Sequence, residues 1–125
     1  MRLLLDTNIL IWSLSNPEKL SKEAKNYLTQ ADLIFVSAIS LWEIHIKAKL
    51  GKIQMETDNL IPSLQQSKIK ELPITWEHTF ATRNLPLYHR DPFDRMLIAQ
   101  AMSEPLILLT HDQVLVQYGD LVKYV

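Results

Sequence analysis

The sequence has 125 residues, of which 47% are hydrophobic and 22% charged, and this composition excludes a predominantly disordered chain. It carries 13 basic and 14 acidic residues, so its net charge of -1 excludes a nucleic-acid binder that relies on overall positive charge. The chain has no cysteine and only 2 glycines, which excludes thiolate chemistry and glycine-rich phosphate loops.

Short apolar runs that end at polar residues predict buried strands, and apolar residues three or four positions apart predict helices. Both patterns alternate along the whole chain without a repeat or a linker. In chain order we expect a strand at Arg2–Leu5, helices from Thr7 to about Ser15 and from Leu20 to Ala31, a strand at Leu33–Val36, a helix from Ala38 to Leu50, a helix around Leu60–Leu64, a strand near Glu71–Leu72, a helix around Trp76–Phe80, a helix from Asp91 to Met102, a strand at Leu106–Leu109 and an edge strand at Leu121–Val125.

This alternation predicts an α/β fold with a mostly parallel sheet that is covered by helices on both faces. Sheets of this kind carry their functional groups outside the carboxyl ends of the strands. The apolar run at the N-terminus is interrupted by Asp6, and no run approaches the roughly 18 residues that a membrane-spanning helix needs. We therefore expect a soluble, cytoplasmic protein without a membrane partner.

Four carboxylates stand at positions that need an explanation. Asp6 and Asp112 follow the ends of two expected strands, and they project from one edge if these strands are neighbours. Glu43 and Asp94 lie on the apolar stripes of two expected helices, where an unpaired carboxylate is costly. Two carboxylates 4 Å apart repel each other by about 4 kcal/mol at an effective dielectric of 20. Convergence of all four would therefore favour a hard divalent cation such as Mg²⁺ or Mn²⁺.

Each of these acids also has a purely structural explanation. Asp6 and Asp112 could cap the helix or turn that follows, and Asp94 could be an acid favoured in the first turn of its helix. Glu43 could pair with Lys47 four residues later, which is worth only ~0.2–0.5 kcal/mol. For Asp91 we favour a helix N-cap, because Asp-Pro at a helix start is a sufficient local reason.

Four stretches of the sequence resemble the motifs of PIN-domain nucleases, in the order in which that family has them. The length of the chain and the stretch His89–Arg95 are most similar to VapC-type toxins of bacterial toxin–antitoxin pairs. The four stretches are Leu3–Asn8, Ser40–Ile44, His89–Ala101 and Leu108–Asp112.

The resemblance implies a three-layer α/β/α sandwich with a sheet of four or five strands, in a single domain over residues 1–125. It implies an endoribonuclease that depends on Mg²⁺ or Mn²⁺ and cleaves RNA phosphodiesters with metal-activated water. It also implies a homodimer that a cognate antitoxin neutralises. On this match the catalytic and metal-binding acids are Asp6, Glu43, Asp94 and Asp112, Asn8 orients Asp6 by a hydrogen bond, and Thr110 and Asp91 support the site.

The arginines beside the third motif have two interpretations. Arg90 and Arg95 could grip a substrate phosphate or the antitoxin, or they could pair with Asp94 and Asp91 four residues away. The tryptophans could stack on bases, but their apolar surroundings favour core packing. The tryptophans are Trp12, Trp42 and Trp76.

Other functions stay open at this point. His89 and His111 could act as acid and base of a metal-independent ribonuclease. A phospho-accepting receiver domain has a similar length, but this chain has the single acid Asp6 after the first strand, no acceptor aspartate after the second strand, and a late lysine, Lys123, that is too near the end. An interaction module with inactive acids is a further alternative.

Overall fold

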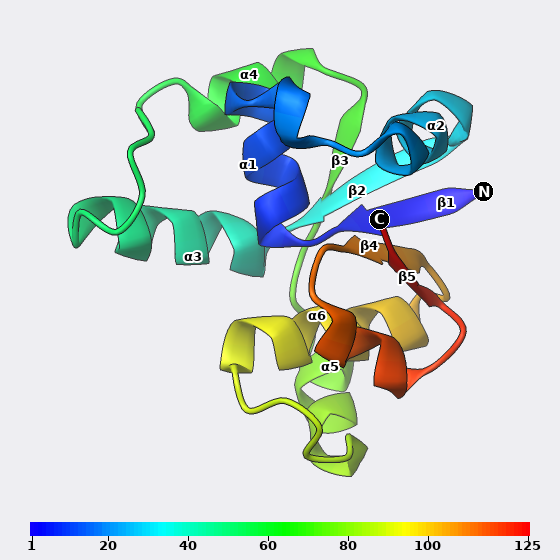
Figure 1. Cartoon of the computed structure of the whole chain (residues 1–125). Coiled ribbons are helices and arrows are strands. Elements are labelled where there is room, and N and C mark those ends of the chain that lie inside the picture. Colours follow the sequence, from blue (N-terminus) through cyan, green and yellow to red (C-terminus); the bar gives the residue numbers. More distant parts are fainter.

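The computed structural model describes residues 1–125 completely, as alternating strands and helices (Figure 1). The strands are β1 (Arg2–Leu5), β2 (Leu33–Ser37), β3 (Ile69–Leu72), β4 (Ile107–Thr110) and β5 (Val122–Tyr124). The α-helices are α1 (Thr7–Ser15), α2 (Lys22–Gln30), α3 (Ala38–Lys49), α4 (Leu60–Gln66), α5 (Trp76–Ala81) and α6 (Pro92–Ser103), and short 3-10 turns cover Pro17–Lys19, Thr82–Asn84 and Gln113–Tyr118.

The strands form one 5-stranded sheet in the order β3-β2-β1-β4-β5, and every neighbouring pair is parallel. Residues 3–5 of the central strand β1 are buried, because the strand has a neighbour on each side and helices on both faces. The expected parallel sheet and its edge strand at the C-terminal end are confirmed. Helix α2 begins two residues later than expected, because the Ser21 hydroxyl accepts a hydrogen bond from the backbone N–H of Ala24 and caps the helix.

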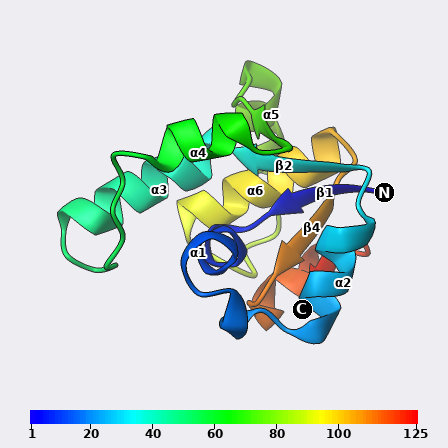
Figure 2. The ribbon, with the colours of Figure 1, turned by 90° about the horizontal axis from the view of Figure 1, so that it is seen from above.

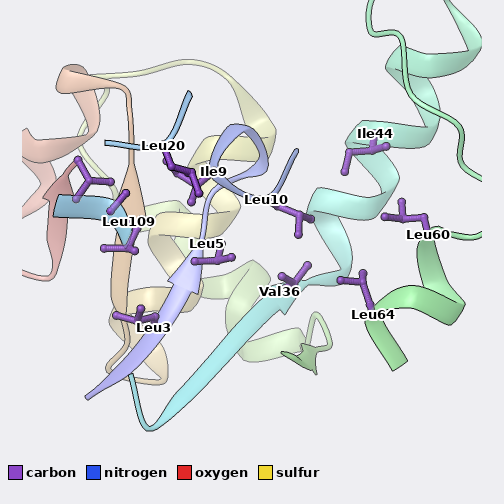
Figure 3. Close-up of a cluster of buried hydrophobic side chains, with 12 residues drawn as sticks. Leu3, Leu5, Ile9, Leu10, Leu20, Val36, Ile44, Leu60, Leu64 and Leu109 are labelled. Carbon is purple, nitrogen blue, oxygen red and sulfur yellow. The ribbon is translucent and has the colours of Figure 1, made fainter. Parts of the chain in front are cut away.

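Alternate side chains of β1 point to opposite faces of the sheet and enter two separate apolar clusters. Leu3 and Leu5 pack with residues of α1, α2 and α4, and Figure 3 shows this cluster. Leu4 packs on the other face with residues of α6 and of the turn at Gln113–Tyr118. Helices therefore cover both faces, as Figures 1 and 2 show, and the expected three-layer α/β/α sandwich is confirmed.

The register of the sheet sets side by side the two strands that carry the first and the last motif. In the parallel pairing of β1 and β4, Leu5 is the partner of Leu109. The backbone N–H of Asp6 continues this pairing by donating to the carbonyl of Leu109 at 3.0 Å. Asp6 and Thr110 therefore leave the sheet at adjacent points of its carboxyl edge.

Two of the tryptophans expected in the core are at the surface, so this prediction was wrong for them. The side chains of Trp42 and Trp76 are 59% and 90% exposed, whereas Trp12 packs against the buried cluster of β1 and α1. Helix α5 has only 6 residues and turns His78, not Trp76, toward the protein interior. None of the helices is both long and apolar enough to span a bilayer.

Candidate active site at the carboxyl edge of the sheet

Asp6 joins the end of β1 to the start of α1 and is 5% exposed. One of its carboxylate oxygens accepts a hydrogen bond from the backbone N–H of Ile9 at 2.9 Å, so Asp6 is the N-cap of α1. The other oxygen accepts from the hydroxyl of Thr110 at 2.5 Å. Burial raises the pKa of Asp6, and these hydrogen bonds oppose that effect.

Thr110 links Asp6 to Asp112 through its hydroxyl group. The hydroxyl donates to Asp6 and accepts the backbone N–H of Asp112 at 3.0 Å. One oxygen of the Asp112 carboxylate accepts from the backbone N–H of Val114 at 3.0 Å, which caps the following turn. The end of β4 therefore fixes both aspartates relative to each other.

Glu43 lies on α3 and is 5% exposed, although it is a glutamate in the middle of a helix. Its Oε1 accepts from the hydroxyl of Thr7 at 2.6 Å, and its Oε2 pairs with Nζ of Lys47 at 2.5 Å. The hydrogen bond to Glu43 raises the pKa of the Lys47 ammonium. Glu43 is therefore buried on the apolar stripe of its helix, and it also forms the expected pair with Lys47. Thr7 was missed in the sequence, where only its place directly after Asp6 marks it.

Asp94 lies in the first turn of α6, and the pKa of its carboxyl is raised to about 7. Desolvation by burial is the largest cause, followed by the negative charges of Asp91 and Asp6, while His89 opposes the rise. Glu43 adds a smaller effect in the same direction. Acids from three of the four motifs therefore act on one another electrostatically.

His89 stands between Asp94 and Asp112. Its Nε2 lies 3.0 Å from Oδ2 of Asp94 and 3.2 Å from Oδ2 of Asp112. One ligand atom of each of these side chains lies within 4.8 Å of the others, a spacing that a metal ion could bridge. Asp6 and Glu43 are not in this group of three. Their negative charges act on it from a distance by raising the pKa of Asp94. The donor set and the surplus negative charge fit a divalent cation.

The hydrogen bond expected from Asn8 to Asp6 is absent, and this prediction was wrong. Asn8 is exposed on the first turn of α1, and the groups that hold the Asp6 carboxylate are Thr110 and the N–H of Ile9. A capping aspartate turns its oxygens toward the helix backbone. The neighbouring strand β4 then supplies the remaining donor.

Of the charged residues around Asp94, two are hydrogen-bonded within the chain and one is not. Asp91 is the N-cap of α6 and accepts from the backbone N–H groups of Phe93 and Asp94 at 2.8 and 3.1 Å. Arg90 is exposed and has no hydrogen-bond or ion-pair partner. Arg95 forms no ion pair, and its guanidinium donates instead to the chain segment 82–89 and to a tyrosine. Its acceptors are the carbonyls of Thr82, Leu85, Pro86 and His89 and the hydroxyl of Tyr118.

The ion pair offered as the structural interpretation of Arg95 was therefore wrong. The expected ion pair with Asp91 does not form, because the Asp91 carboxylate is turned onto the N-terminus of α6. The guanidinium donates to carbonyl oxygens of the preceding segment, and a contact with a phosphate or an antitoxin stays a prediction.

Comparison with known proteins agrees with this arrangement. Residues 3–121 match the family described as the PIN domain. The chain is 30% identical over 113 residues to Ribonuclease VapC22 of Mycobacterium tuberculosis, covering 88% of this chain and 86% of that protein.

Solved structures share the fold at lower identity. VapBC2 of Rickettsia felis, crystallised with a DNA fragment from its promoter, has a TM-score of 0.73 at 18% identity and covers 99% of this chain and 98% of that one. A toxin–antitoxin complex from Klebsiella pneumoniae has a TM-score of 0.67 at 21% identity and covers 97% and 95% of the two chains. FitAcB from Neisseria gonorrhoeae also has a TM-score of 0.67, at 19% identity, and covers 99% and 96%.

The fold, the acidic edge of the sheet and these matches define the class: the chain belongs to the PIN-domain family. Within that family, its likeness to Ribonuclease VapC22 places it among the VapC-type proteins.

Proposed function

We propose that this protein is a divalent-metal-dependent endoribonuclease, with Asp6, Glu43, Asp94 and Asp112 as its catalytic and metal-binding acids. The observation that carries the proposal is the convergence of donor atoms of His89, Asp94 and Asp112 within 4.8 Å of one another, where burial and the charges of Asp91 and Asp6 also raise the pKa of Asp94. A site that only stabilised the fold would gain nothing from such repulsion, whereas a cation relieves it. The match to a ribonuclease over 88% of the chain supports the same function.

A divalent cation bound here would polarise a phosphodiester and lower the pKa of an attacking water. The chain supplies the groups that hold and orient the charges. Asp94 and Asp112 would hold the cation, and Thr110 keeps Asp6 aligned with Asp112. Lys47 pairs with Glu43 on the same face of α3 and neutralises part of its charge. A bound cation would also supply the local positive charge that attracts RNA phosphates to a chain of net charge -1.

We also propose a homodimer in the cytoplasm whose activity a cognate antitoxin blocks. The structural neighbours from Klebsiella pneumoniae and Rickettsia felis, a toxin–antitoxin complex and VapBC2, support such a partner. A freely exposed Arg90 beside the acidic site is a suitable contact for an acidic partner or for a phosphate. The inactive interaction module is the competing function, and metal-dependent cleavage separates the two.

The first prediction concerns the cation. The purified protein, freed of any bound partner, should cut total cellular RNA into discrete fragments with Mn²⁺ or Mg²⁺ and should lose this activity in excess EDTA. Fragments are resolved on a denaturing gel, and their ends are mapped by sequencing. Cleavage that survives EDTA and leaves 2′,3′-cyclic phosphates would instead support His89 and His111 as acid and base. No cleavage with any divalent ion would favour the inactive module.

The second prediction concerns Arg90. In a cleavage-inactive Asp94→Asn background, Arg90→Gln should weaken RNA binding a few-fold and reduce the slope of log affinity against log salt by about 0.7, the value for one contact to a single strand. Fluorescence anisotropy over a salt series measures both quantities. The matched control is Arg83→Gln, since the Arg83 guanidinium packs on the Phe80 ring 4.6 Å from its centroid. An unchanged salt slope in the Arg90 variant would remove this residue from the RNA contact.

A further inference from the structure

We propose that His89 is a nitrogen ligand of the divalent cation, so that the site binds Mn²⁺ in preference to Mg²⁺. The inference rests on the proposed function and adds a ligand of a different chemical kind to the acids. Imidazole nitrogen suits transition metals, whereas Mg²⁺ is bound by carboxylates and water. One histidine among carboxylates therefore changes which ion the site selects.

The positions of the donor atoms carry the inference. Nε2 of His89 lies 3.0 Å from an oxygen of Asp94 and 3.2 Å from an oxygen of Asp112. Two atoms that bind the same ion at about 2.1 Å each lie no more than about 4.2 Å apart. The nitrogen already meets this condition with each of the two carboxylate oxygens. A cation could therefore enter between them with small side-chain movements.

The backbone of His89 is held on both sides, which aims its ring at the acids. Its N–H donates to the hydroxyl of Tyr118 at 3.0 Å, and its carbonyl accepts from the guanidinium of Arg95 at 3.2 Å. The side chain is 25% exposed, so the ring is accessible to an ion from solution. A surface histidine without function has no need of such fixation.

Ligation requires one change in the imidazole. The backbone N–H of Asp91 approaches Nδ1 at 3.4 Å, and this contact is given up when Nδ1 carries a proton. In the ligand form the proton is on Nδ1, and Nε2 offers its lone pair to the cation. The contact to be given up is long and therefore weak. The opposing possibility is that His89 only holds the place of the cation and is displaced by it.

Pulsed electron paramagnetic resonance of bound Mn²⁺ distinguishes these possibilities without reference to activity. The wild-type protein should show electron spin echo modulation from a directly coordinated nitrogen, and His89→Gln should lose it. Calorimetric titration should show Mn²⁺ affinity falling by roughly tenfold or more in this variant, with a smaller change for Mg²⁺. Matched controls are His111→Gln beside Asp112 and His45→Gln on the exposed face of α3, and both should keep the modulation.

Mn²⁺ that binds without nitrogen modulation would overturn the inference and leave the proposed function intact. A higher Mn²⁺ affinity in His89→Gln would also overturn it, because a displaced placeholder competes with the cation. Modulation that persists in His89→Gln but is lost in His111→Gln would show that His111 is the nitrogen ligand, and this would overturn the inference. Absence of Mn²⁺ binding by the wild-type protein would overturn the proposed function together with the inference. Thermal melts in EDTA establish that each variant is folded.

Discussion

Asp94→Asn should abolish RNA cleavage and, at the same time, stabilise the metal-free protein at neutral pH. Loss of a carboxylate that faces the cation should lower the cleavage rate at least about 100-fold, which corresponds to about 2.7 kcal/mol of transition-state stabilisation. The asparagine amide keeps the shape of the side chain but carries no charge. The repulsion that Asp91 and Asp6 exert on position 94 is therefore removed.

The stability effect has a defined pH window. The pKa of Asp94 rises from 3.8 to about 7 on folding, so the folded protein retains a proton that the unfolded chain has lost. The stability of the wild-type protein should therefore decrease as the pH rises from about 4 to about 7, and it should level off above that. A shift of this size corresponds to at most about 4 kcal/mol. The asparagine variant avoids this loss, apart from a weaker contact with His89.

Urea unfolding in EDTA at several pH values between 5 and 8 measures the difference between the two proteins. The gain in the free energy of unfolding of Asp94→Asn should be smallest at pH 5 and largest at pH 8. Asp120→Asn, a change of the same kind at an exposed position, should leave stability within about 0.5 kcal/mol. A variant that is less stable than the wild type at pH 8, or one that still cleaves RNA, would contradict the role given to Asp94.

The fold could be predicted because its signals are local. The run Leu3–Leu5 is apolar on both faces of the strand, which only a sheet covered on both sides can use. Gly51, with a φ of 72°, marks the end of α3, and Asp91-Pro92 marks the start of α6. The sequence could not assign the strand order β3-β2-β1-β4-β5, because pairing depends on contacts between distant segments.

The acids of the site could be predicted for a different reason: each is an exception to the local pattern. Glu43 and Asp94 interrupt apolar stripes, and Asp6 follows a strand directly. The partners of these acids gave no such signal. Thr110 reaches Asp6 across 104 positions of sequence, and a polar residue at a strand end has many ordinary explanations.

Trp76 and Arg95 show where the local sequence pattern was misleading. Trp76 and Phe80 share one face of α5, as expected, but that face is turned to solvent with exposures of 90% and 60%. Arg95 was assigned by its spacing from Asp91, whereas its partners lie in a loop whose path no sequence pattern describes. Periodicity identifies a face of a helix, and only the tertiary structure identifies what that face meets.

Arg95→Met should lower the free energy of unfolding by about 2–4 kcal/mol, because it removes the hydrogen bonds that hold the segment 82–89. The guanidinium makes hydrogen bonds of 3.0 to 3.4 Å to four carbonyls and one hydroxyl, all in the segment 82–89 or on Tyr118. Methionine keeps the apolar stem of the side chain but removes these hydrogen bonds, although Thr82 and Pro86 each keep a second donor, the N–H of Leu85 and the hydroxyl of Tyr118. The stability of Arg95→Lys should lie between those of the wild type and Arg95→Met. An ammonium group lacks the planar fork of donors with which the guanidinium reaches several acceptors at once.

Chemical denaturation of the wild type, Arg95→Lys and Arg95→Met measures their order of stability. Arg90→Met, directly after the segment 82–89, is the matched control. Arg90 is exposed and makes no hydrogen bond, so its removal should change stability by no more than about 0.5 kcal/mol. The segment that Arg95 ties down ends at His89, whose ring faces Asp94 and Asp112. Arg95→Met should therefore also weaken Mn²⁺ binding even where the protein remains folded. Equal stability of Arg95→Met and Arg90→Met would show that the hydrogen bonds of Arg95 do not hold the loop.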